Sequence, residues 1–195
     1  MARLETFADG VFAIAATLLI LSVDGAVHDP TDLTHAWPAY VAYAVSFMTI
    51  GIMWMNHHLV MNQVARIDRR FMIATLGLLM CIAFVPFPTR LVAEHVRDSS
   101  ARDAALAYGF TLTVTATFFS IVWFYAARGR RLLRDDCDPR VVAGISRSYL
   151  PGPFIYLAAT LIAFASSWAS VILYLVIAAV YVAESSVFGG RADTV

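Results

Sequence analysis

The sequence predicts an all-α integral membrane protein with six transmembrane helices per chain and both termini in the cytoplasm. Of its 195 residues, 60% are hydrophobic and only 14% are charged. An ordinary soluble domain contains about 45–50% apolar and about 25% charged residues. Six helices of about 20 residues each account for the excess, because that length crosses a bilayer. This composition disfavours a soluble enzyme, a disordered chain and a secreted disulfide scaffold.

Six apolar segments supply the predicted helices. We expect them at Leu4–Val23, Trp37–Met55, Phe71–Thr89, Ala104–Ala126, Leu150–Ser166 and Ala169–Val187. Only a few residues separate the last two, which must therefore form a tight hairpin. Pro86 and Pro88 should kink or end the third helix, because proline lacks the backbone N–H. Tryptophans lie close to the predicted helix ends, as in an interfacial aromatic belt, at Trp37, Trp54, Trp123 and Trp168.

The charges of the loops set the orientation of these helices. The loop after the first helix carries Asp24, Asp29 and Asp32 and no arginine, whereas the loops after the second and fourth are rich in arginine. The positive-inside rule then places those two loops and both termini in the cytoplasm. We expect a short amphipathic or surface helix within 127–149, and an interfacial position or an arginine partner for Glu184. Residues 1–195 then form one six-helix transmembrane unit without an internal repeat.

Several kinds of chemistry are disfavoured by the residues that the chain lacks. It has no lysine, so Schiff bases and the P-loop lysine are excluded. Its formal net charge is zero, which gives no basic face for nucleic acid. Cys81 and Cys137 fall in an apolar run and a polar loop, so neither a disulfide nor a thiolate metal site is expected. With no catalytic constellation in view, we predict neither an enzyme nor a cofactor.

The first helix is the most informative segment. Heptad spacing places one stripe of residues along it, made of Gly10, Ile14, Thr17, Leu21 and Asp24, with Leu18 beside it. One interpretation is ordinary packing against neighbouring helices. The other is a pore-lining helix, in which Ile14, Leu18 and Leu21 form an apolar constriction. Thr17 would then supply a ring of hydroxyls, and Asp24 at the outer mouth would concentrate cations.

Asp9 lies inside the membrane near the cytoplasmic end of this helix. It is rotated roughly 100° from Gly10 and is expected to face another helix rather than the pore. Arg3 and the segment Trp54-Met55-Asn56-His57-His58 are its candidate partners, because intramembrane charges are usually paired. His57 and His58 diverge by roughly 100° and do not suit one metal ion. Coupling of these histidines to cytosolic pH is a further hypothesis.

The start of the chain resembles a known signature. Arg3 followed by Phe7-Ala8-Asp9 resembles the motif of the transmembrane-protein-175 family, an arginine, three variable residues and Phe-Ser-Asp. The second-helix ending 54–58 and the third-helix ending 84–89 also resemble prokaryotic members. Ala8 stands where the motif has serine, so any hydrogen bond of that hydroxyl is replaced or lost.

The resemblance implies a homotetramer in a bacterial inner (plasma) membrane, with the first helices around a central pore. It implies an apolar constriction at Ile14, further layers at Leu18 and Leu21, and a role for Thr17 in potassium preference. The chain lacks a carbonyl filter motif and a voltage sensor, so we expect a leak-type channel that conducts potassium ions and needs no cofactor. Two alternatives remain: a proton-coupled transporter or proton leak that uses Asp9, His57 and His58, and an accessory membrane protein.

Overall fold

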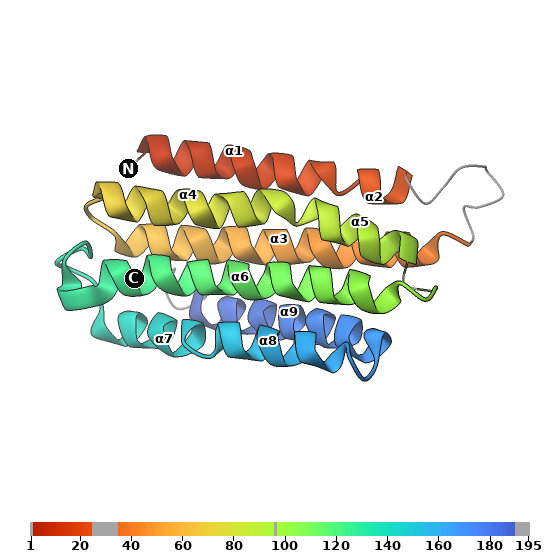
Figure 1. The fold of residues 1–195 in the computed structure, drawn as a ribbon. Helices are drawn as coiled ribbons and strands as arrows, with labels where there is room; N and C mark the ends of the chain where they lie inside the picture. Colours follow the sequence, from red (N-terminus) through yellow and green to blue (C-terminus); the bar gives the residue numbers. More distant parts are fainter. Residues whose placement is uncertain (1, 25–34, 96, 190–195) are drawn as a thin grey trace.

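The computed structural model describes residues 2–24, 35–95 and 97–189, and only the backbone of 178, 179 and 181–189. This part of the chain is helical apart from turns and one isolated antiparallel bridge between Val64 and Leu133. In chain order the elements are α1 (Ala2–Leu18), α2 (Leu21–Asp24), α3 (Trp37–Gln63), α4 (Arg69–Phe84), α5 (Pro86–His95), α6 (Ala101–Ala127), the 3-10 turn η2 (Arg128–Arg130), α7 (Pro139–Tyr149), α8 (Gly152–Ile162) and α9 (Ser167–Gly189) (Figure 1).

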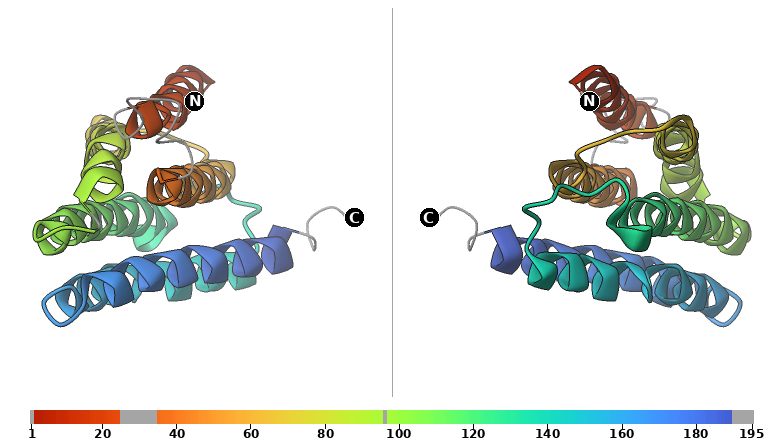
Figure 2. Two further views of the ribbon diagram at one scale, coloured as in Figure 1. Left: turned by 90° about the vertical axis from the view of Figure 1, so that its right-hand side faces the viewer. Right: turned by 90° about the vertical axis from the view of Figure 1, so that its left-hand side faces the viewer.

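The helices lie side by side in an elongated bundle (Figure 1). Seen along the bundle, α1 lies at one edge, and α7, α8 and α9 lie at the opposite edge (Figure 2). Between them, α4 packs against α1 and α6, while α6 also packs against α8. The first helix is therefore peripheral within its own chain.

Four helical stretches of the described chain are long and apolar enough to cross a membrane: Ala2–Asp24, Trp37–Gln63, Arg69–His95 and Ala101–Arg130. The chain is thus a multi-pass membrane protein. Helix α8 has 11 residues, which corresponds to only about 16 Å of helix, and α7 precedes it directly. Six membrane-spanning helices per chain remain a prediction, whereas the predicted contact between α8 and α9 is confirmed.

Two differences from the predicted helix boundaries affect the first helix and its partner α3. Helix α3 continues to Gln63, two turns beyond the predicted end at Met55. The polar residues after Met55 indicated a surface, but His57 among them is only 3% exposed. The first helix also breaks after Leu18 and resumes at Leu21. No proline or glycine lies at this break, so the sequence did not predict it. The predicted kink of the third helix is confirmed, since α4 ends at Phe84 and α5 begins with Pro86.

The predicted surface helix within 127–149 is confirmed as α7. Asp138 caps its N-terminus by accepting from the backbone N–H of Arg140, and Ile145 and Tyr149 form its buried side. Trp123 of α6 is fully buried and donates through Nε1 to Ser146 Oγ across 2.9 Å. Trp123 lies four residues before the end of α6, close to a helix end as predicted, but its ring is buried as a packing contact for α7 instead of being exposed at the membrane surface.

The other tryptophans are exposed and include a pair that joins two helix starts. Trp37 of α3 stacks on Trp168 of α9 with ring centroids 6.3 Å apart. The guanidinium of Arg97 lies 5.0 Å from the Trp37 ring centroid, a cation–π distance. These contacts hold the starts of α3 and α9 to the α5–α6 connection. Asp29, Asp32 and the side chain of Glu184 lie outside the described residues.

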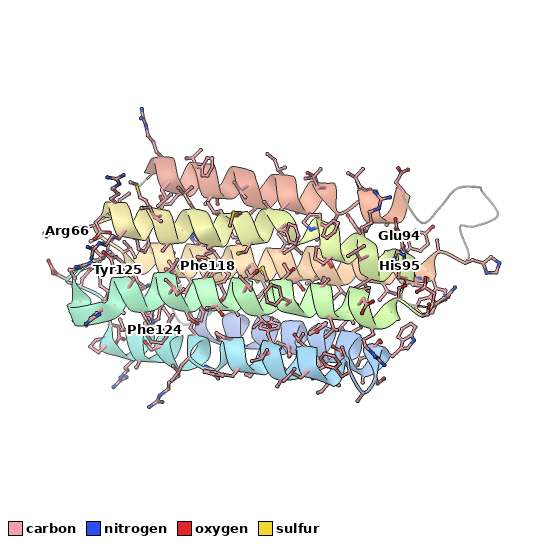
Figure 3. The ribbon with its side chains drawn as sticks, in the orientation of Figure 1. Arg66, Glu94, His95, Phe118, Phe124 and Tyr125 are labelled. Carbon is pink, nitrogen blue, oxygen red and sulfur yellow. The ribbon has the colours of Figure 1, made fainter. Side chains whose placement is uncertain are left out.

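A polar cluster closes the opposite end of the bundle, where Figure 3 labels Tyr125 and Arg66. The Asp68 carboxylate caps α4 by accepting from the backbone N–H of Phe71 across 2.8 Å. It also accepts from Tyr125 OH across 2.6 Å and from Arg131 Nη2 across 3.2 Å. The Tyr125 hydroxyl holds the pKa of Asp68 below its ordinary value, with smaller help from the Phe71 N–H and from Arg131. This cluster ties α4 to the end of α6.

Candidate pore-lining helix

The first helix has two faces with opposite surroundings. One face is buried against the rest of the chain, and its members recur at heptad spacing: Ala8, Phe12, Ala15, Leu19 and Ser22. Ala8 and Ala15, seven residues apart on this face, let α1 lie close to α3 and α4, as small residues do at membrane helix interfaces. This buried face fixes the rotation of α1 about its own axis, and with it the direction of every other side chain.

The opposite face carries the stripe that the sequence singles out. Ile14 is 61% exposed, Leu21 51% and Leu18 43%. The remaining members, Gly10, Thr17 and Asp24, are also exposed. The stripe therefore points away from the chain's own bundle, at the edge seen in Figure 2. Packing against other helices of the same chain does not explain it.

The polar group in the middle of the stripe has a defined orientation. The hydroxyl of Thr17 donates to the carbonyl oxygen of Ile14 across 2.9 Å. Because the hydrogen is committed to the backbone, the lone pairs of Oγ1 remain free to accept. The helix breaks directly beyond this point, and the buried hydroxyl of Ser22 donates to the Leu19 carbonyl across 2.7 Å. Leu21 and Asp24 therefore belong to α2, which packs against α5.

Asp9 faces α3 rather than the stripe. Its Oδ1 accepts a hydrogen bond from Trp54 Nε1 across 2.8 Å. His58 stacks on the Trp54 ring, with ring centroids 6.1 Å apart. His57 packs against Phe12 at a centroid distance of 5.6 Å, and its Nε2 has no hydrogen-bond partner among the described residues. The structure thus brings together Asp9, Trp54 and the two histidines at the contact of α1 with α3.

The remaining motif residues lie elsewhere. Arg3 and Phe7 are both exposed, and Arg3 has no ion-pair partner in the part of the chain that the structure describes. Ala8 is fully buried. A serine hydroxyl at that position would need a partner inside the helix contact, whereas the alanine methyl needs none.

Sequence reasoning missed two contributors to this region. Phe12 supplies the ring that covers His57, and only the heptad spacing of the buried face marks it.

At the far end, where Figure 3 labels Glu94, Arg90 Nε contacts Glu94 Oε1 across 2.6 Å. Arg90 also lies within electrostatic range of Asp24. The i,i+4 spacing of Arg90 and Glu94 was the available signal. Asp24 therefore shares its end of the bundle with a second acid and a guanidinium.

Comparison with known proteins gives a consistent result. The family model described as "Endosomal/lysosomal potassium channel TMEM175" matches residues 3–86. A potassium channel of Chamaesiphon minutus is 39% identical over 191 residues, which cover 94% of each chain. A potassium channel of Streptomyces collinus is 45% identical over 152 residues, 75% of this chain and 72% of the relative. The crystal structure of a lysosomal potassium-selective channel TMEM175 homolog from Chamaesiphon minutus superimposes with a TM-score of 0.84 at 38% identity, over 94% of this chain and 97% of that one.

Proposed function

Because this chain belongs to the endosomal/lysosomal potassium channel TMEM175 family, we propose that it is a potassium-preferring, leak-type cation channel. Its conduction path runs along the outward stripe of the first helix. A single observation carries this proposal: one heptad face of α1 is buried against the rest of the chain, whereas the opposite face is exposed. Membership of a channel family supports an ion path, and the exposure of the stripe supports this surface as the one that forms it.

The constriction is made by the branched side chains of Ile14, Leu18 and Leu21. An apolar ring offers an ion no replacement for its hydration water, so passage through a narrow ring costs the part of the shell that must be shed. Potassium loses water at lower cost than sodium, which gives a preference without a carbonyl filter. Thr17 lies between these layers. Its hydroxyl donates to the Ile14 carbonyl, so the lone pairs of its oxygen can face a passing cation. Asp24 with Glu94 keeps the outer end acidic despite Arg90.

The proposed assembly is a homotetramer of six-helix units in a bacterial inner membrane, with the lipid bilayer and further copies of the chain as partners. One peripheral helix cannot surround an ion, so several copies must meet along their α1 edges. The exposed stripe at the bundle edge supports this arrangement. Asp9, Trp54, His57 and His58, together with Arg3 and Phe7, then form the support that sets the tilt of α1 on its cytoplasmic side.

A proton-coupled transporter or proton leak is the second candidate. The observation that favours it is His57, which is buried beside the Asp9–Trp54 pair with an unpartnered Nε2 within the described chain. A titratable ring in such a place can exchange a proton. A transporter differs from the channel in the driving force that potassium movement needs, and a proton leak differs from it by carrying protons without potassium.

Flux from liposomes loaded with potassium tests the function. Purified protein should release potassium down its gradient at equal pH on both sides, and should release sodium more slowly from matched liposomes. Potassium flux that saturates and requires a proton gradient would favour the transporter instead. Absence of flux across lipid compositions and voltages would favour an accessory protein without transport.

A further inference from the structure

A groove runs along the far edge of the bundle from α7 down to α8 and α9. Its volume is about 800 Å³, which lies within the range of small-molecule sites. Arg140 and Arg147 of α7 line its upper part. Ile155 of α8 and Val176 and Val180 of α9 line the part inside the bundle. The groove is thus cationic at one end and apolar along the rest.

The two arginines stand on one face of α7. They are seven residues apart, which is two helical turns or about 10 Å along the axis. Both are exposed. Neither guanidinium has a carboxylate partner among the described residues, whereas Arg90, Arg131 and Arg134 each have one. Both guanidinium groups are thus exposed at the groove and form no ion pair with a described residue.

The groove begins beside the end of the apolar α6 stretch Ala101–Arg130, where a membrane-spanning helix is expected to meet the lipid headgroups. Helix α7 lies at the end of the bundle that carries the N-terminus, and α8 continues from it along the bundle (Figure 1). Arginine at this depth meets lipid phosphates, and the valine and isoleucine side chains beyond it meet hydrocarbon.

We propose that this groove binds one anionic phospholipid per chain. Its phosphate accepts hydrogen bonds from Arg140 and Arg147, and an acyl chain lies along Ile155, Val176 and Val180. Arginine suits this role because its planar fork donates two parallel hydrogen bonds to a phosphate. The apolar floor distinguishes a lipid from a soluble phosphate, which has nothing to place there. The proposal concerns lipid binding and is independent of which ion the pore conducts.

The test counts lipids that remain bound to the full-length protein. Protein reconstituted in mixed phosphatidylglycerol and phosphatidylcholine is extracted in mild detergent, and native mass spectrometry counts each lipid per chain. The parent should retain phosphatidylglycerol in preference to phosphatidylcholine. The double variant Arg140→Gln/Arg147→Gln should retain about tenfold less, because it loses charge-assisted hydrogen bonds to the phosphate. Arg128→Gln, which removes an exposed arginine outside the groove, should bind as the parent does.

The apolar half of the groove is tested separately. Val176→Trp keeps both arginines and fills the floor, so it should also lose phosphatidylglycerol, whereas Leu175→Trp on the same helix should not. Equal retention by the parent and by either groove variant would overturn the proposal. So would an equal loss in Arg128→Gln, which would indicate only general surface charge. Displacement of the bound lipid by excess inorganic phosphate would also overturn the proposal, because it would show that the groove is a site for a soluble anion.

Discussion

Trp54 and Asp9 join the first two long helices through one hydrogen bond, from the indole Nε1 to the carboxylate Oδ1 across 2.8 Å. The donor lies on α3, nine residues before its end, and the acceptor lies in the third turn of α1. Because the bond ends on a charge, it is stronger than one between neutral groups. It holds the rotation of α1 at the point from which the outward stripe begins.

Replacing Trp54 with phenylalanine should therefore destabilise the protein by about 1.5 kcal/mol, the lower end for a hydrogen bond to a charged group, because Asp9 is exposed. Thermal unfolding in detergent measures the change. Trp37→Phe is the matched control, because the Trp37 ring makes stacking contacts while its N–H has no acceptor among the described residues. Equal loss in both variants would assign the effect to ring size alone.

The variant Ile14→Asn should raise potassium conductance and lower the potassium-to-sodium permeability ratio severalfold, because an amide lets water into the apolar ring. Bilayer recordings with both cations measure this. Ile172→Asn places the same change on α9, at a side chain of similar exposure, 56% against 61%. If Ile172→Asn altered selectivity as much, the filter would not lie on α1.

Thr17→Ala should reduce potassium preference and leave the melting temperature unchanged. It removes the only hydroxyl of the outward stripe, whose hydrogen bond to the Ile14 carbonyl is local to the helix. Thr6→Ala removes an equivalent exposed bond, to the Ala2 carbonyl at the same 2.9 Å, near the start of α1. An unchanged permeability ratio in Thr17→Ala would remove this hydroxyl from the ion path.

Gly109→Ala should destabilise the protein by about 1–3 kcal/mol through overpacking. A Cβ at Gly109 of α6 would collide with the Tyr174 hydroxyl and with Thr160 Oγ1, both buried. Gly51→Ala on α3 meets nothing within 4 Å and should gain up to about 1 kcal/mol from helix propensity. Chemical or thermal unfolding separates the two, and equal stability of both variants would contradict the close packing of α6 with α8 and α9.

Acid should weaken the cluster around Asp68. Its pKa is lowered from 3.8 by the Tyr125 hydroxyl first of all, so its stabilisation is complete above that value. The stabilisation is lost as the pH falls through the lower folded-state pKa. Asp68→Asn keeps a helix cap but has no charge, so it should be less stable at neutral pH and lose less stability on acidification.

Melting temperatures measured from neutral pH down to about pH 2 cover this loss and measure the difference. Asp135→Asn provides the control, since Asp135 is exposed and has no hydrogen-bond or ion-pair partner among the described residues. A parallel acid response of Asp68→Asn and the parent would show that other carboxylates govern acid sensitivity.

The fold was predictable where a residue acts locally. Pro86 interrupts the third helix because, inside a long helical segment, its missing N–H removes one bond of the hydrogen-bond ladder. The end of α3 was not predictable in this way. Asn56, His57 and His58 are polar and indicate water, yet His57 is buried because Phe12 of another helix covers it. Trp123 likewise was assigned to the membrane surface, and its burial depends on α7, which packs there from a distant part of the chain.

The candidate site likewise has features that one helix determines and features that depend on contacts between helices. Heptad spacing alone identified the stripe from Gly10 to Asp24, because periodicity is a property of one helix. Which face of that helix turns toward the chain depends on the partner surface, and only the structure places Ala8, Phe12 and Ala15 there. The break between Leu18 and Leu21 and the position of Arg90 near Asp24 arise from contacts with α5, for which a single sequence offers no direct signal.

The edge position of α1 also bears on how such a protein is made without harming its host. A newly inserted chain presents Ile14, Leu18 and Leu21 to lipid, where they are well solvated, and it encloses no water. In the proposed assembly the ion path comes into existence only when copies associate. Biosynthesis can therefore fill the membrane with monomers that are electrically silent, and the onset of conduction is set by the surface density at which chains find one another.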